Sequence, residues 1–150
     1  LGPQPENSIT GWIMQQAFEF RHVYQPIYLA DEPGDAVDAV WFKTIGPVPD
    51  DPQLHTALLA YASDYNLLYP IYRKHGLVPG SPTLRTASLD HAMWFHRPPR
   101  VDEWMLYVTA SPTATGGRGL AMGRIFNRAG ELLASVAQEG TIRVGSKPIG

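Results

Sequence analysis

Residues 51–70, DPQLHTALLAYASDYNLLYP, decide the fold. Apolar side chains recur there at steps of three and four residues, which is the spacing of one face of an α-helix. This apolar stripe consists of Leu54, Leu58, Tyr61, Ala62, Tyr65, Leu68 and Tyr69. Asp51 is a suitable N-cap, and Pro52 fits the first helical position. We therefore predict one long amphipathic helix that Pro70 ends or kinks, with a further turn running to His75.

Strand patterns lie on both sides of this helix. Before it, residues 17–24 and 39–45 read as strands, with a loop at 29–36. After it come four more strand patterns, at 84–96, 104–110, 119–126 and 131–144. A single amphipathic helix cannot cover both faces of a six-stranded sheet, but a strongly curved sheet wrapped around the helix would bury its stripe. The sequence therefore predicts an α+β fold with a curved antiparallel sheet around one long helix.

Composition excludes several classes of protein. With 150 residues, 44% hydrophobic and 17% charged, the chain is expected to be one globular domain. Its net charge of -2 gives no electrostatic basis for binding nucleic acid. It contains no Cys, and its histidines lack ligand spacing, so we expect no disulfide and no metal site. No apolar run is long enough to span a bilayer, and we expect a cytoplasmic protein without membrane contact.

The pattern at 84–96 overlaps the segment SLDHAMWFHRP, residues 88–98, whose polar groups stand where a plain strand would be apolar. Strict alternation places Ser88 and His91 on opposite faces of this strand. A hydroxyl, a carboxylate and an imidazole beside aromatic residues indicate a place to look for chemistry. We expect the neighbouring Trp94 and Phe95 to be packed.

Asp64 and Gln138 are two further candidates. Asp64 lies at the edge of the apolar stripe, where a partly desolvated carboxylate is suited to act as a base; the alternative is a solvated flank residue. Gln138 shares a strand face with Val136 and Ile142, so its amide requires partners, which are either the backbone or a bound water. The hydroxyl of Ser88 stands at the head of its strand, a position that is also ordinary for serine.

Several segments together resemble the type II acyl-CoA thioesterases, the TesB-like family. The segments are Leu58–Asn66, Ala87–Pro98, Asp102–Tyr107, Gly117–Gly119 and Ala134–Gly140. The similarity extends from about Phe18 to Arg143. That family has a double-hotdog fold, and this chain resembles its C-terminal module. The resemblance implies a hotdog domain at 17–150 after a linker-like segment at 1–16, and either a homo-oligomer or pairing with a second hotdog module.

The resemblance also implies an activity and a site. It implies hydrolysis of acyl-CoA by an activated water, with Asp64, Ser88 and Gln138 as catalytic residues and no cofactor besides the coenzyme A of the substrate. Asp64 would accept the proton of the water, while Ser88 and Gln138 would hold it. Among residues of the matching segments, we expect Tyr65, His91, Gly117 and Arg118 to contact the substrate.

Two alternatives remain open. A hotdog hydratase resembles an Asp-x-Asn-Pro-x-His pattern, which Asp64 and Asn66 begin, but Leu67 replaces the proline and Tyr69 the histidine. The other alternative is a non-catalytic acyl-CoA-binding or assembly half of a double-hotdog protein.

Overall fold

The computed structural model describes residues 17–29, 32–145 and 147–149, so the linker-like segment predicted at 1–16 lies outside the described residues. In chain order the strands are β1 (Phe18–His22), β2 (Val37–Thr44), β3 (Leu84–Ser88), β4 (Ala92–Phe95), β5 (Met105–Thr115), β6 (Arg118–Asn127), β7 (Leu132–Val144) and β8 (Lys147–Pro148). The helices are the short 3-10 helix η1 (Ile27–Leu29), α2 (Pro52–Ser63) and α3 (Tyr69–Lys74). None of the helices described is long and apolar enough to cross a membrane.

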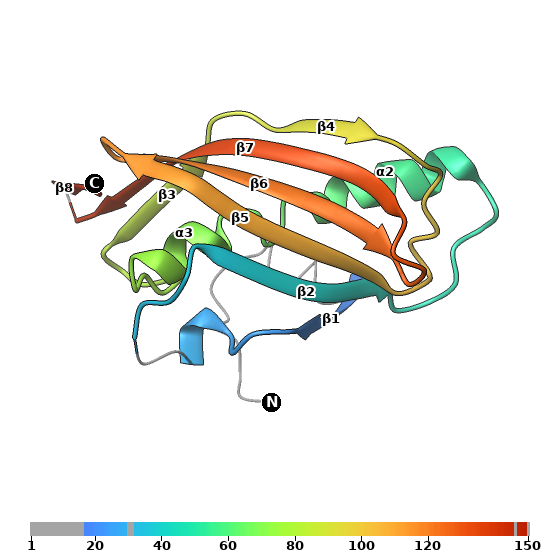
Figure 1. The fold of residues 1–150 in the computed structure, drawn as a ribbon, viewed down its shortest axis with the longest axis horizontal. Helices are drawn as coiled ribbons and strands as arrows, with labels where there is room; N and C mark the ends of the chain where they lie inside the picture. The colour runs from blue at the N-terminus through green and yellow to red at the C-terminus, as the bar shows by residue number, and fades with distance from the viewer. Residues whose placement is uncertain (1–16, 30–31, 146, 150) are drawn as a thin grey trace.

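The described strands form one antiparallel sheet with the order β1-β2-β5-β6-β7-β3, and both β4 and β8 also pair with β7. The sheet curves around the helices, and α3 packs against β2, β5 and β6 (Figure 1). Apolar residues from β1, β2, β5, β6, β7 and the helices η1, α2 and α3 form one buried core. This arrangement confirms the predicted α+β class with a curved antiparallel sheet wrapped around helical structure.

The prediction of one long helix was wrong. Helix α2 ends at Ser63 and α3 begins at Tyr69, with turns at residues 64–68 between them. Pro70 lies in the first turn of α3, where its missing N–H costs nothing, and so it starts a helix rather than ending one. The buried face of α2 is also rotated relative to the predicted stripe and consists of His55, Leu59, Ala62 and Ser63. Leu54 and Tyr61 are exposed.

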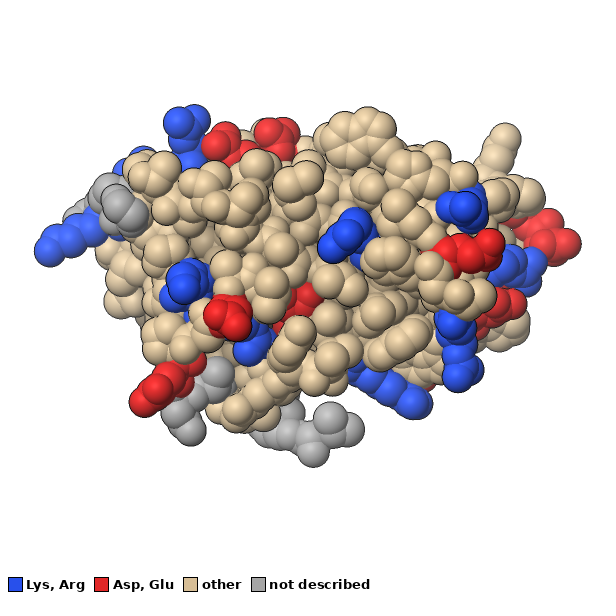
Figure 2. Space-filling model, viewed as in Figure 1, with Lys and Arg blue, Asp and Glu red and all other residues tan. Residues whose placement is uncertain are grey.

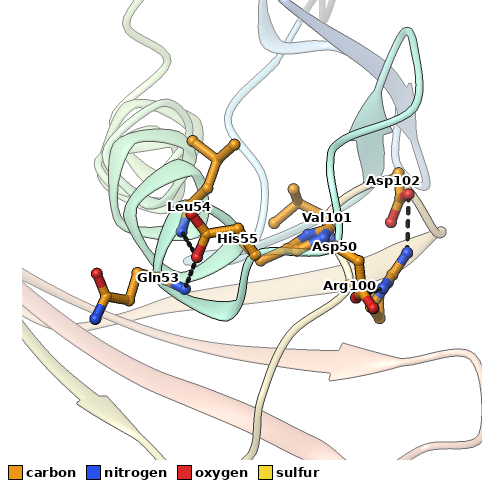
Figure 3. Close-up of polar contacts among 8 residues, drawn as sticks. Asp50, Gln53, Leu54, His55, Arg100, Val101 and Asp102 are labelled. Atoms are coloured by element: carbon orange, nitrogen blue, oxygen red, sulfur yellow. Dashed lines mark hydrogen bonds and ion pairs between the residues drawn. The ribbon is translucent and has the colours of Figure 1, made fainter.

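Polar contacts fix the start of α2, as predicted from Asp51 and Pro52. The carboxylate of Asp51 accepts hydrogen bonds from the backbone N–H groups of Gln53 (2.9 Å) and Leu54 (3.4 Å) (Figure 3). One turn further on, the buried His55 accepts the backbone N–H of Val101 at Nδ1 (3.1 Å), which ties the helix to the segment before β5. Beside it, the exposed Arg100 bridges Asp50 and Asp102 (Figure 3).

The strand predicted at 84–96 is two strands, β3 and β4, which both pair with β7. Ser88 lies opposite Gly140 and Ala92 lies opposite Ala137. Residues 89–91 therefore face only residues 138 and 139 of β7, so the edge of the sheet carries one extra residue, which is a β-bulge. The bulge breaks the strict alternation that placed Ser88 and His91 on opposite faces.

The expected packing of Trp94 and Phe95 was also wrong. On β4 these side chains are 54% and 45% exposed.

On the face shown in Figure 2, charged side chains of both signs are scattered among mostly uncharged ones and form no patch of a single sign.

The predicted turn at 127–130 is confirmed. It joins β6 and β7 as a tight hairpin, in which Gly130 has a φ of 84° and the side chain of Asn127 accepts the backbone N–H of Glu131. The glycine-rich bend before it joins β5 and β6, with positive φ at both Gly116 and Gly117. Positive φ at two adjacent residues suits a two-residue hairpin turn.

A buried ion pair joins α3 to β2. Arg73 donates to Asp38 at 3.0 Å, and the two side chains are only 12% and 1% exposed. Burial raises the pKa of Asp38 above its ordinary value even though the guanidinium of Arg73 opposes the shift. The second carboxylate oxygen of Asp38 has no hydrogen-bond partner among the described residues. The burial of the Asp38 carboxylate is therefore compensated by its ion pair with Arg73.

Replacing Arg73 with methionine is expected to lower the free energy of unfolding by about 3 kcal/mol or more, because it leaves a buried carboxylate without its partner. Arg118→Met is the matched control, since Arg118 pairs with Glu139 at 3.7 Å on the surface and should cost less than about 1 kcal/mol. Urea denaturation of both variants checks this, and equal losses would contradict a special role for the buried pair.

Candidate functional site

Gln138 occupies the centre of the candidate site. It projects from β7 into the core and is 1% exposed, as its predicted strand face required. Its Nε2 donates to the hydroxyl of Ser88 at 2.8 Å, and its Oε1 contacts Nδ1 of His91. The described partners of the buried amide are therefore two side chains of the neighbouring edge, Ser88 and His91.

The bulge at residues 89–91 makes this arrangement possible. Because residues 89–91 oppose only two residues of β7, both Ser88 and His91 reach the same amide. Asp90 stabilises the bulge, since its carboxylate accepts the backbone N–H of Glu139 at 2.7 Å. The backbone N–H of Leu89 donates to the carbonyl of the same Glu139 at 2.8 Å.

Asp64 lies at the C-terminal end of α2, directly after Ser63. Its carboxylate is exposed rather than partly desolvated as expected from the helical stripe, because the helix ends at this residue. Ser63 is fully buried, and its hydroxyl lies 2.8 Å from Nε2 of His91. Ser88 thus contacts Gln138 directly, whereas Asp64 is adjacent in the chain to Ser63, whose hydroxyl contacts His91.

Tyr107 holds the end of α2 against the sheet. Its hydroxyl donates to the carbonyl of Ser63 at 2.7 Å. Burial raises the pKa of Tyr107 well above its usual range, and the nearby charge of Asp64 raises it further. The ring fits because residue 123 on β6 is glycine: a Cβ there would lie 2.9 Å from the hydroxyl oxygen of Tyr107 and would overlap its ring. The buried Tyr107 therefore fixes the position of Ser63 and, with it, that of the adjacent Asp64.

Of the four residues expected to contact substrate, only His91 is in this network. Tyr65 is half-buried and stacks on Phe20 with ring centroids 4.3 Å apart. Gly117 lies in the bend between β5 and β6, where its N–H donates to the carbonyl of Ile149. Arg118 pairs with Glu139, while the adjacent Gly119 faces Ile71 in the core. Since side chains alternate along a strand, Arg118 points to the opposite face from Gln138. Its contact with substrate stays a prediction, as do those of the other three.

Two polar residues of the site were not identified from the sequence. Ser63 precedes the candidate Asp64 and lies four residues after the buried Leu59, a helical spacing that could have indicated its burial. Asn66 was considered only as part of the hydratase pattern, but it is 1% exposed and neither atom of its amide has a hydrogen-bond partner among the described side chains and backbone.

The site is open to solvent on one side. Asp64, Ser88 and His91 are exposed, whereas Gln138 and Ser63 are buried beneath them. Among the described residues, no three His, Asp or Glu side chains come close enough to hold a metal ion. The arrangement offers an exposed carboxylate, a hydroxyl and a fixed amide, which are groups that bind and deprotonate a water or an alcohol.

Comparison with known sequences gives one consistent result. A family model described as acyl-CoA thioesterase matches residues 14–141. Acyl-CoA thioesterase 2 of Haemophilus influenzae is 42% identical over 103 residues, which cover 69% of this chain and 36% of that protein. Acyl-coenzyme A thioesterase 8 of Mus musculus is 43% identical over 108 residues, covering 69% and 32%. The chain therefore spans about a third of the length of these curated relatives.

Solved structures agree with the sequence comparison. Acyl-CoA thioesterase II TesB2 from Mycobacterium marinum matches with a TM-score of 0.76 and 44% identity, covering 97% of this chain and 56% of that one. A protein from Alicyclobacillus acidocaldarius with a hot dog fold matches with a TM-score of 0.70 at 21% identity, covering 96% and 50%. These matches confirm the hotdog fold expected for this chain.

The bulge can be tested through Asp90. In Asp90→Ala the backbone N–H of Glu139 loses its acceptor, so its amide should exchange with solvent faster, and the free energy of unfolding should fall by about 1 kcal/mol. Asp90→Asn keeps an acceptor oxygen and should behave as the wild type. Amide exchange followed by NMR and urea denaturation measure the two effects. Equal exchange of Glu139 in both variants would contradict the role of Asp90.

Proposed function

Because the chain belongs to the acyl-CoA thioesterase family, we propose that its site hydrolyses acyl-CoA thioesters to a fatty acid and CoA. One observation carries the proposal beyond family membership: the buried amide of Gln138 is fixed against Ser88, in a network that extends through His91 to Ser63, the residue before Asp64. Asp64, Ser88 and Gln138 are the residues that the sequence resemblance had indicated as catalytic.

The chemistry follows from the protonation of these groups. Gln138 donates to Ser88, so the hydroxyl proton of Ser88 is left to donate outward to a bound water. Asp64, exposed beside this site, accepts a proton from that water as it attacks the thioester carbonyl carbon. The carbon–sulfur bond then breaks, the thiolate of CoA leaves and takes up a proton, and the acid is released. No covalent intermediate with the protein is required.

The open side of the site supports a second part of the proposal, that another hotdog module covers it. Asp64, Ser88 and His91 are exposed in this chain. Large apolar side chains of α2, the bulge and β4 are exposed as well, among them Leu54, Tyr61, Leu89, Trp94 and Phe95. Water-excluding walls strengthen electrostatic interactions in an active site. We infer that the partner is a second copy of this chain or another hotdog module.

The activity is tested by thiol release from acyl-CoA esters of several chain lengths. Asp64→Asn should lower kcat by roughly 100-fold or more, because the amide cannot accept the proton of the water. Asp35→Asn is the matched control, since Asp35 is an exposed carboxylate in the loop before β2, and it should leave the rate unchanged. Full turnover by a folded Asp64→Asn variant would exclude Asp64 as the base.

The same assay separates two other functions. Binding of CoA without thiol release, at high protein concentration and with a second hotdog module added, would favour a non-catalytic binding or assembly module. Consumption of a trans-2-enoyl-CoA without release of thiol would favour a hydratase.

Self-association is a separate expectation. The exposed apolar side chains and the strand edges at β1 and β4 should drive formation of a dimer or larger oligomer. Light scattering at about tens of micromolar protein measures this, a concentration at which weak interfaces are occupied. A monomer under these conditions would contradict pairing between copies of this chain.

A further inference from the structure

The proposed mechanism uses Gln138 and Ser88 but assigns no role to His91 and Ser63. These four residues form one continuous line of contacts across α2, the bulge and β7. The hydroxyl of Ser63 lies 2.8 Å from Nε2 of His91, and Nδ1 of His91 contacts Oε1 of Gln138. Nε2 of Gln138 then donates to Ser88 at 2.8 Å. His91 is the link between the buried helix end and the amide.

The orientation of the amide matters for Ser88. A glutamine amide carries a carbonyl oxygen on one side and an NH₂ group on the other, and a half-turn exchanges them. With NH₂ toward Ser88, the serine accepts and keeps its own proton for a ligand. With the oxygen toward Ser88, the serine would donate to Gln138 and lose that proton to the protein. The hydroxyl itself selects neither orientation, because it can donate or accept.

His91 selects between the two orientations. The observed contact requires a proton on Nδ1 of His91, because Oε1 of Gln138 can only accept. Ser63 supports that proton when its hydroxyl donates to Nε2 of the ring. If the hydroxyl of Ser63 donates to Nε2, the neutral ring carries its proton on Nδ1. If the hydroxyl donates instead to the carbonyl of Ala60 at 2.7 Å, Nε2 must donate to Ser63, and only a ring that carries a proton on both nitrogens then keeps the contact of Nδ1 with Oε1 of Gln138.

Met93 adds a steric and a weak polar contact on the same side. Its sulfur lies 3.1 Å from the hydroxyl oxygen of Ser63, and its side chain is half-buried against the core. The imidazole is therefore placed between Ser63 and Gln138 by the helix end, the bulge and the first residues of β4.

We propose that His91 is a positioning residue for the hydrolysis proposed above, which orients the amide of Gln138 through its Nδ1 proton and so leaves the hydroxyl proton of Ser88 free for the water. The inference rests on the proposed function, but its hydrogen-bonding part is a property of the protein without substrate. His91 acts through Gln138 and need not touch the acyl-CoA.

A matched pair of substitutions tests the role of Nδ1. The amide nitrogen of asparagine stands two bonds from Cβ, as Nδ1 of histidine does, whereas the amide nitrogen of glutamine stands three bonds away, as Nε2 does. His91→Gln should lower kcat for octanoyl-CoA by at least about tenfold, equivalent to about 1.4 kcal/mol, with KM changed less than about threefold. His91→Asn should recover most of the lost kcat, because it restores the donor to Gln138.

A double substitution tests whether the effect passes through the amide. In a Gln138→Leu background, adding His91→Gln should lower kcat by less than about twofold, because there is no amide left to orient. If His91→Gln costs the same factor with and without Gln138, or if His91→Asn and His91→Gln lose equal activity, His91 does not act by orienting Gln138.

NMR separates this inference from the activity itself. In the wild type and in His91→Asn, the side-chain NH₂ protons of Gln138 should show nuclear Overhauser contacts to the β-protons of Ser88, and His91→Gln should lose them. Contacts retained in His91→Gln would overturn the inference even if the enzyme is active. Wild-type protein that releases no thiol, but shows this pattern of contacts, would overturn the proposed function and leave the orienting role of His91 supported.

Discussion

The side-chain amide of Gln138 is buried in β7, and its donor and acceptor must both be satisfied inside the protein. Four strands pair with β7: β6 and β8 on one side, and β3 and β4 on the other. A continuous strand on that side would present only one of Ser88 and His91 to the amide. The bulge at residues 89–91 presents both. The need of the buried amide for a donor and an acceptor therefore accounts for the bulge at this edge of the sheet.

The remaining features of the site support that geometry. Asp90 occupies the backbone N–H of Glu139, which the bulge would otherwise leave unpaired. Tyr107, whose ring is accommodated by Gly123, anchors the carbonyl of Ser63. Ser63 in turn contacts His91, and Asp64 follows Ser63 at the end of α2. A rigid inner layer thus carries an outer layer of exposed carboxylate and hydroxyl, as expected for a site whose substrate arrives from solvent or lies against a second module.

The sequence predicted the sheet, its curvature and the turn at 127–130, because alternation and turn residues are local signals. It did not predict the break between α2 and α3, because the apolar spacing of residues 54–69 continues through the turns at 64–68. It also missed the bulge, because a single inserted residue leaves a strand pattern intact on either side. The inward face of Gln138 followed from periodicity, but its partners depended on the register of β3 and β4 against β7.

Asp64, Ser88 and Gln138 were indicated by resemblance to a family, and the structure adds the contacts that relate them. Ser88 is hydrogen-bonded to Gln138 directly, whereas Asp64 is only the chain neighbour of Ser63, whose hydroxyl contacts His91. The direction of each hydrogen bond between Ser63 and Ser88 could not be predicted from residue types, because serine, histidine and glutamine can each donate or accept.

The central claim is that the bulge places Ser88 and His91 on the same buried amide. The most direct measurement is a crystal structure of this protein at a resolution that defines the side chains of residues 88–92 and 138–140. The account predicts one extra residue between Ser88 and Ala92 relative to β7, with Gln138 between Ser88 and His91. A regular strand in which His91 points to the face opposite Gln138 would contradict it.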